Sequence, residues 1–469
     1  MSHAESIIER LQAEGVRVVD FRFTDLAGHW RHTSIDAASL DARQLEQGFM
    51  IDGSSIPGWR DPTEADVALK PDLTSARQDP FAAQPTLILL ANVVDPATGQ
   101  GYEGCSRSVA ARAEAWLAGH AAADRMTTSV ATGYFIFDDV RIETSAARNA
   151  IEINGSESEA AGGQAYASGN PGHRPQPCAA RYALSPADHQ SDIRAEITSI
   201  LASLGFTGIR HDHGQSPMQG RLAFKGDHLT GTADRIQLMK YVVQHVAASY
   251  GKSASFMPRP MPESMGSGMS LQHSLWKRGK PVFAGSGYAD LSPQCLSFVA
   301  GIMRHARALN AFTNPTTNSY RRLRKKASEP VYLAYAAYNR SAAVRIPFAA
   351  EPAAKTVDIR FPDPAANPYL ALAAIMMAGI DGIEQKLEPG DAMDRNLYDL
   401  GPDEVDDLPT VALSLREALD ALEHDQDFLL RGDVMSEDLI ASYVSLKRQE
   451  IERISQAVIP LEYELYYGS

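Results

Sequence analysis

The order of apolar and polar residues predicts a small, strand-rich N-terminal region. Residues 2–14 predict a short helix, and residues 16–23 alternate apolar and polar side chains as a strand does. The alternation returns after a DLAG turn, at 29–35, which predicts a β-hairpin. The continuous apolar run at 85–95 predicts a strand that is buried on both faces.

A PATGQG turn follows that run, and we place a domain boundary there, between residues 1–103 and residues 104–469. The second region mixes helices with strands. Helices are expected at 191–205, 232–251 and 293–312. Strands are expected at 134–142, 254–258, 269–276, 342–347 and 356–364. Residues 145–180, rich in Gly, Ala, Ser and Pro, predict a long irregular segment.

Composition narrows the class of protein. A formal net charge of −14 argues against a general nucleic-acid-binding protein. The longest apolar stretch, at 369–380, is too short to span a bilayer and fits a buried helix, so no membrane partner is expected. No signal segment is recognisable at the N-terminus, and Cys105, Cys178 and Cys295 lie far apart, which favours a reducing, cytoplasmic location.

Candidate chemistry first appears in GSGMSLQHSLW, residues 266–276. Side chains repeat every two residues along a strand, so Ser270, Gln272 and Ser274 are expected on one face. A glycine-rich turn that leads into a polar strand face is typical of a strand that lines a pocket.

Two further strand segments, which we expect to be neighbours, carry arginines. Asp358 and Arg360 share a face of one, and Arg345 lies on the other with Arg340 just before it. Guanidinium groups suit carboxylates and phosphates, but structural salt bridges explain the same pattern equally well.

Three weaker signals remain. His211 and His213 share a strand face and could hold a metal, although two ordinary polar histidines are favoured because no third ligand is identifiable. RRLRKK at 321–326 is either a solvated loop or a collector of anions. DGSSIPGW at 52–59 could cradle a phosphate, but such a loop alone is weak support.

Long blocks of the chain resemble type I glutamine synthetases nearly from end to end. They include DGSSI (52–56), YGKSASFMPRPM (250–261), NPTTNSYRRL (314–323), NRSAAVRIP (339–347), RFPDPAANPYLALAA (360–374) and MDRNLYDL (393–400). The resemblance implies an α+β protein: a small β-grasp domain, then a large catalytic-type domain whose antiparallel strands form a funnel-shaped site. It also implies two stacked hexameric rings with sites shared between neighbours. The family reaction uses ATP and two Mg²⁺ or Mn²⁺ ions to join ammonia to glutamate.

The resemblance assigns roles to several residues of this chain. Asp52 matches the ammonium-site aspartate, and Ser55 is its neighbour in the substrate site. Arg322, Arg340, Arg345 and Arg360 match arginines that bind glutamate and phosphate, and Ser274 is a further substrate-binding candidate. Tyr398 lies in a loop that some members adenylylate, although an ordinary loop tyrosine is the favoured interpretation.

The metal positions depart from the family pattern. Ala131, Gly133, Gly214, Arg221 and Ser270 stand where the family has glutamates or histidines, as does Gln272, and only Asp358 keeps a carboxylate. Ser328 replaces the glutamate of the active-site flap, and Arg181 replaces a tyrosine near the nucleotide. We therefore expect no bound metal and no required cofactor, and a pocket that binds a glutamate-like or phosphate-like anion.

Three functions follow from this pattern. The favoured one is a glutamine-synthetase-like pseudoenzyme with a binding or regulatory role in nitrogen metabolism, in a homo-oligomer or in mixed oligomers with an active paralogue. The first alternative is a working ligase that makes glutamine or a γ-glutamyl amide, with metal ligands such as His211, Asp212 and His213. The second is a metal-free enzyme that uses Arg221 as a built-in cation.

Overall fold

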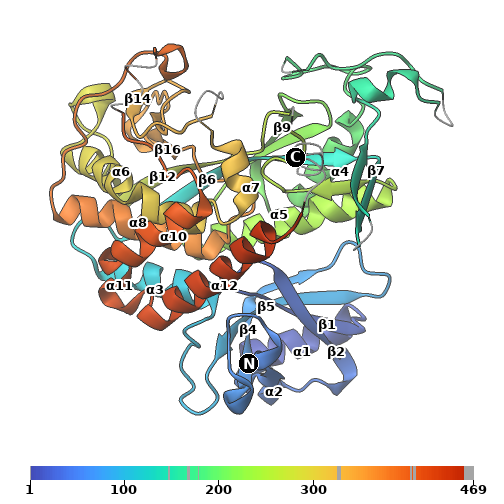
Figure 1. Ribbon diagram of the computed structural model, residues 1–469. Helices are drawn as coiled ribbons and strands as arrows, with labels where there is room; N and C mark the ends of the chain where they lie inside the picture. The colour runs from blue at the N-terminus through green and yellow to red at the C-terminus, as the bar shows by residue number, and fades with distance from the viewer. Residues whose placement is uncertain are drawn as a thin grey trace.

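The structure is a computed structural model. It describes residues 2–145, 148–165, 169–177, 179–262, 264–324, 329–401, 404 and 408–458. A smaller N-terminal sheet lies below a larger α/β body in Figure 1, where it is drawn in blue.

The N-terminal region is a five-stranded sheet with two short helices packed against it. Its strands run in the order β2 (Trp30–Asp36), β1 (Val18–Thr24), β5 (Thr86–Val94), β4 (Asp66–Gln78) and β3 (Phe49–Asp52). β1 and β5 are parallel and the other pairs are antiparallel. The helices are α1 (His3–Ala13) and α2 (Ala42–Gln47); a capping box of Ser2 and Glu5 starts α1, whose Ile7 and Leu11 enter the core of this sheet.

The larger body is built on a nine-stranded sheet. The path runs β14 (Tyr335–Ala337), β15 (Val344–Ile346), β16 (Val357–Ile359), β12 (Met269–Lys277), β6 (Arg125–Phe137), β10 (Gln219–Lys225) and β9 (Thr207–His213). β11 (Ser253–Ser255) adds to β6, and β13 (Lys280–Pro281) adds to β12. All of these pairs are antiparallel except β14 with β15.

Helices cover this sheet. They are α3 (Ser106–Gly119), α4 (Ser191–Ser203), α5 (Leu229–Ser249), α6 (Pro293–Thr313), α7 (Thr317–Arg322), α8 (Pro368–Glu384), α10 (Leu415–His424), α11 (Asp427–Leu430) and α12 (Glu437–Ser455). The apolar stretch at 369–380 forms the buried α8. A Cβ on Gly301 of α6 would lie 2.2 Å from the carbonyl oxygen of Ala378, and one on Gly382 of α8 would lie 2.2 Å from that of Ser297, so the close crossing of α6 and α8 needs a glycine on each helix. In the part of the chain that the structure describes, no helix is both long and apolar enough to cross a bilayer.

A buried polar network fixes the N-terminal sheet to the larger body. Arg107 at the start of α3 pairs with Asp72 of β4 at 2.6 Å and with Asp234 of α5 at 3.0 Å. The Asn367 amide donates to the backbone carbonyl of Asp25 at 3.1 Å. Because both contacts join the N-terminal region to helices of the larger body through groups largely shielded from water, they set the relative position of the two regions. The turn between β5 and α3 holds the expected boundary at 103/104, which stays a prediction.

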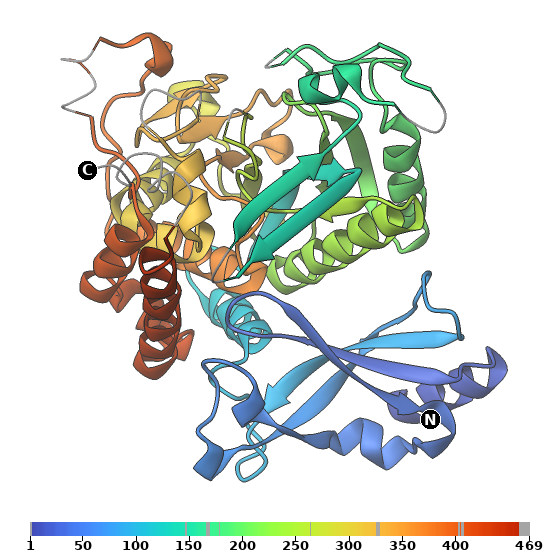
Figure 2. The same ribbon diagram turned by 45° about the vertical axis from the view of Figure 1, so that its right-hand side comes forward.

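The segment expected as one strand at 134–142 is two strands. β6 ends at Phe137, and β7 (Asp139–Thr144) pairs with β8 (Asn149–Asn154) in a separate hairpin. Figure 2 shows this hairpin standing apart from both main sheets. Asp138 lies between the two strands, and its carboxylate accepts hydrogen bonds from the ammonium of Lys252 and the backbone N–H of Ser156. The irregular segment expected at 145–180 therefore contains a strand that its composition concealed.

Candidate functional site

A cavity with a volume of about 670 Å³ opens on the sheet between β10, β6, β12 and β16. β15 and β16 are neighbours, as the sequence predicted, with Arg345 directly opposite Asp358. β12 presents Ser270 and Gln272 to the cavity, so the prediction that this strand lines a pocket is confirmed for these two residues.

The cavity is strongly basic. Among the described residues that line it, the acidic ones are Glu329 and Asp358. The basic ones are Arg181, Arg210, Arg221, Lys225, Arg322, Arg340, Arg345 and Arg360. An excess of guanidinium groups around a partly enclosed space attracts anions, in spite of the negative net charge of the chain as a whole.

Asp358 is already committed to its neighbours. One carboxylate oxygen accepts a hydrogen bond from the Ser270 hydroxyl, and the other lies 3.5 Å from a terminal nitrogen of Arg345. The aspartate side chain is 4% exposed. The sequence left structural salt bridges open as an alternative to ligand binding, and Arg345 and Asp358 do form such a salt bridge.

Arg322 is buried at the cavity wall and held on several sides. It donates to the Glu329 carboxylate at 2.8 Å, to the Pro362 carbonyl at 3.1 Å and to the Phe361 carbonyl. A Cβ on Gly266 would lie 2.6 Å from Arg322 Cγ, which explains the glycine at the start of GSGM. Gly266, the first residue of GSGM, therefore leaves room for the buried side chain of Arg322.

Glu329 was missed by sequence reasoning. Burial raises the pKa of its carboxyl, and the nearby Arg322 and Arg360 oppose the shift without cancelling it. The only signal was its place beside Ser328 in RKKASEP, one residue after the position expected for a flap glutamate. Ser328 itself lies outside the described residues.

Arg340, Arg360 and Tyr398 meet at one rim of the cavity. Arg360 donates to the Ala342 carbonyl at 3.3 Å, and the Tyr398 hydroxyl donates to the Arg340 carbonyl at 3.2 Å. Burial raises the pKa of Tyr398, and Arg360 opposes that shift. Tyr398 packs beside the arginines, and its modification stays a prediction.

Three residues assigned to the substrate site do not line the cavity of this chain. Ser274 is 4% exposed and sits further along β12, opposite Thr127. Asp52, the last residue of β3, and Ser55, in the turn that follows, are both exposed, and hydrogen bonds from Ser54 lower the pKa of Asp52. Their assigned roles stay predictions.

The positions that match the family's metal ligands leave no room for restored ligands at two points. A Cβ on Gly133 would lie 2.8 Å from Ser267 Oγ, and a Cβ on Gly214 would lie 2.4 Å from Gln219 Oε1. Gln219 also donates to Ser267 Oγ at 3.2 Å, so one network fills both places. Ala131 lies in register with Ser270, and neither side chain can supply a charged donor.

Arg221 stands directly opposite Gly133, with Asp212 on its other side. The described residues around the cavity therefore do not fit a site for two divalent cations, which needs several anionic oxygen ligands.

His211, Asp212 and His213 do not form a metal site together. Asp212 pairs with Arg181 at 2.9 Å, whereas His213 is buried and lies 3.0 Å from Glu157. Burial lowers the pKa of His211.

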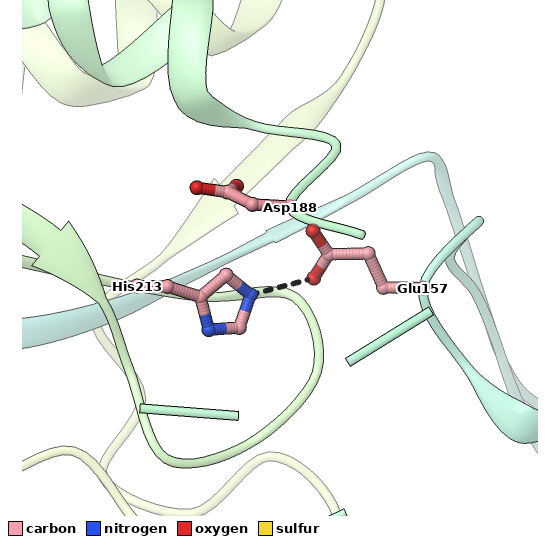
Figure 3. Close-up of side chains that lie close together, drawn as sticks. All are labelled: Glu157, Asp188 and His213. Atoms are coloured by element: carbon pink, nitrogen blue, oxygen red, sulfur yellow. Dashed lines mark hydrogen bonds and ion pairs between the residues drawn. The ribbon is translucent and has the colours of Figure 1, made fainter. Parts of the chain in front are cut away.

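Glu157, Asp188 and His213 are the one group of three possible metal donors among the described residues. Figure 3 shows the His213 ring directed at Glu157, while Asp188 makes no bond to either. Asp188 pairs with Arg194. The other Glu157 oxygen accepts from the His189 backbone N–H at 2.8 Å, and His213 Nδ1 lies 2.9 Å from the Gly214 carbonyl oxygen. These donors are engaged with protein groups and lie outside the cavity lining, so the cluster is structural, and through Glu157 it joins His189 to His213 of β9.

A β-grasp sheet joined to a catalytic-type domain with an arginine-lined antiparallel sheet defines the class of this protein. A family model described as "Glutamine synthetase, beta-Grasp domain" matches residues 15–96, and one described as "Glutamine synthetase, catalytic domain" matches residues 103–466. The chain therefore belongs to the glutamine synthetase family, and the expected α+β fold with its N-terminal β-grasp domain is confirmed.

Individual relatives agree along the whole length. The chain is 46% identical over 468 residues to the glutamine synthetase of Azospirillum brasilense and 44% identical over 468 residues to that of Rhizobium meliloti, with 100% of each chain covered. It is similar to the solved Plasmodium falciparum glutamine synthetase, with a TM-score of 0.90 and 25% identity over 100% of this chain and 99% of that one. A structure described as "Apo GmaS without ligand" has a TM-score of 0.82 and 28% identity over 99% of both chains.

These comparisons correct two expectations. The inactive, regulatory function is wrong, because full-length relatives at 43–46% identity are glutamine synthetases, and they favour the alternative of an active ligase. The expectation of no cofactor is wrong on the same ground, because the family uses ATP and a divalent metal. The replaced ligand positions do not overturn this, although they set this cavity apart from the family pattern.

Proposed function

We propose that this chain is an ATP-dependent ligase that forms an amide on the side-chain carboxylate of glutamate, with ammonia or another amine as the nitrogen donor. Two observations support it: the full-length similarity to glutamine synthetases, and a cavity of about 670 Å³ lined by the guanidinium groups of Arg322, Arg340, Arg345 and Arg360. The cavity carries the proposal, because its charge suits a carboxylate substrate and a phosphate chain together.

The reaction divides into two balanced steps. The γ-phosphorus–oxygen bond of ATP breaks as a carboxylate oxygen of glutamate takes the phosphoryl group, which leaves ADP and an acyl phosphate. The amine nitrogen then attacks the acyl carbon, the carbon–oxygen bond to phosphate breaks, and the amine loses a proton. Arg340, Arg345 and Arg360 hold the charge that develops on the phosphoryl oxygens. Glu329 is the carboxylate that we assign to accept the proton, since its raised pKa suits proton transfer.

A divalent cation belongs to the chemistry of the family, but the cavity does not offer the donor set for two such ions on the expected positions. We therefore assign no step to a metal bound by residues 131, 133, 214, 221 or 270. In the steps above the chain's own guanidinium groups add positive charge to that of the divalent cation which the family reaction uses.

The test is a direct assay of the purified protein with ATP, glutamate and either ammonium or a panel of primary amines. Phosphate release and the amide product, identified by mass spectrometry, are measured with Mg²⁺, with Mn²⁺ and with a chelator. Amide formation that requires ATP is expected. Arg345→Gln should abolish it, while Arg307→Gln, an exposed residue of α6 paired with Glu417, should not change it. Absence of amide with every amine and metal would overturn the proposal.

We also propose that the chain works as a cytoplasmic homo-oligomer of stacked hexamers. The exposed position of Asp52 and Ser55 supports this, because a shared site would bring them to the cavity of a neighbouring copy. Cys105 and Cys295 are buried free thiols, as suits a reducing compartment. Analytical ultracentrifugation tests the assembly, and a monomer in every buffer would contradict it.

A further inference from the structure

The side of the cavity formed by β6, β10 and β9 carries a surplus of positive charge that the family's arginines do not explain. Arg221 projects from β10 directly opposite Gly133, which offers it no charged partner, and it lines the cavity. Arg181 lies close by, and both arginines line the same cavity.

One carboxylate serves both of these arginines. Asp212 lies 2.9 Å from Arg181 Nε but 3.9 Å from the nearest nitrogen of Arg221. The exposed fractions are 25% for the Arg181 side chain, 21% for Arg221 and 12% for Asp212, so the surplus charge is only partly solvated. Two guanidinium groups that share one carboxylate keep one net positive charge.

Like charges converge on Arg221 from several elements. Burial lowers its pKa, and Arg181, Arg210 and Arg340 lower it further, against the opposing effect of Asp212. Arg340 follows β14, which lies at the far end of the sheet from β10 and β9. Because Asp212 is the one carboxylate paired with Arg181 and Arg221 among the described residues, positive charge is in excess here, and an anion between these groups would be attracted to them.

We propose that Arg221 and Arg181 form a phosphate-binding subsite across the cavity from Arg340 and Arg345, and that together they take a di- or triphosphate chain, free or carried by a nucleoside. Guanidinium forks match phosphate oxygens in pairs, and arginines on two sides of one cavity select a ligand with more than one anionic group. The inference rests on the proposed function for the source of the phosphate chain, but its test is a binding measurement that does not require turnover.

The experiment measures the affinity of tripolyphosphate, pyrophosphate, ATP and adenosine by isothermal titration calorimetry, in buffer with a chelator. The proteins are the unmodified oligomer, Arg221→Gln, Arg221→Lys and the control Arg307→Gln. Loss of one charge-assisted phosphate pair should weaken tripolyphosphate binding about tenfold, which corresponds to about 1.4 kcal/mol. Arg307→Gln should bind as the unmodified protein does, and Arg221→Lys should lie between it and Arg221→Gln because it keeps the charge but loses the fork.

Circular dichroism and elution volume establish that each variant keeps its fold and assembly, and Arg221→Lys carries the comparison if Arg221→Gln does not fold. The subsite would be overturned if the affinity for tripolyphosphate changed less than twofold in the Arg221 variants, or if the unmodified protein did not bind tripolyphosphate. Tight binding of ATP and tripolyphosphate alike assigns the subsite to the phosphate chain of a nucleotide. Binding through Arg221 together with no amide formation in any assay would reject the proposed ligase and leave the subsite standing.

Discussion

The guanidinium of Arg322 donates to the carboxylate of Glu329 over 2.8 Å, and both groups line the basic cavity. The Arg322 side chain is 1% exposed and that of Glu329 is 12% exposed. Removing one partner of such a pair leaves an uncompensated charge in a poorly solvated place.

Glu329→Ala should therefore lower the free energy of unfolding by about 3 kcal/mol, since breaking a buried ion pair costs of that order. Glu329→Gln should cost less, because its amide oxygen can still accept from Arg322. Both should slow amide formation, since neither can take a proton from the amine. Urea unfolding at one fixed protein concentration measures the first effect, and the ligase assay the second. Full activity in folded Glu329→Gln would remove Glu329 from the reaction.

A methyl group at position 133 should be poorly tolerated. Its contact at 2.8 Å with Ser267 Oγ would force β6 or the 264–268 loop to move, and such overpacking typically costs about 1–3 kcal/mol. We expect Gly133→Ala to lower the melting temperature, and Ser267→Gly in the same chain to recover part of the loss.

The matched control is Gly162→Ala, where an added Cβ meets nothing within 4 Å. Equal melting temperatures for Gly133→Ala and this control would mean that the space at Gly133 is open. It would then be open to a metal ligand as well.

His213 should make stability depend on pH. Burial lowers the pKa of its imidazole, but the ion pair with Glu157 outweighs that effect and the pKa is raised. The stabilisation is complete below the ordinary histidine pKa of about 6.5 and is lost as pH rises through the higher folded-state value. The difference in unfolding free energy between the unmodified protein and His213→Gln should thus be larger near about pH 6 than near about pH 8.5.

His3→Gln, at the exposed start of α1, serves as the comparison and should show no such trend. If the unfolding free energies of His213→Gln and the unmodified protein changed with pH in parallel, His213 would not be charged in the folded protein.

Arg107 should hold the N-terminal sheet in place. Arg107→Gln leaves Asp72 and Asp234 without their shared cation, and a loss of about 3–5 kcal/mol is expected for a buried pair of this kind. Limited proteolysis between β5 and α3 should become faster, because the two regions would separate more often. Arg307→Gln is again the control. An unchanged cleavage rate in Arg107→Gln would mean that the contacts of Asn367 are enough to hold the N-terminal sheet in place.

Much of the secondary structure could be predicted from the sequence, because periodicity is a local property. The helical spacing of Ile193, Ile197 and Leu201 gave α4 within two residues at its C-terminal end, and two short alternating runs gave the strands β15 and β16. β8 was missed, because it lies in a segment whose overall composition resembles a loop.

The candidate site, too, could be predicted only in part from the sequence. The sequence by itself determined which residue types stand at each position: the arginines, the single retained Asp358, and the glycines at 133 and 214. Only the tertiary structure decided which of them meet. It filled the space beside both glycines with Ser267 and Gln219, turned His213 away to Glu157, and brought Glu329 onto Arg322. Such contacts join residues from separate strands and loops, and their distances depend on how the whole sheet packs, which no local pattern records.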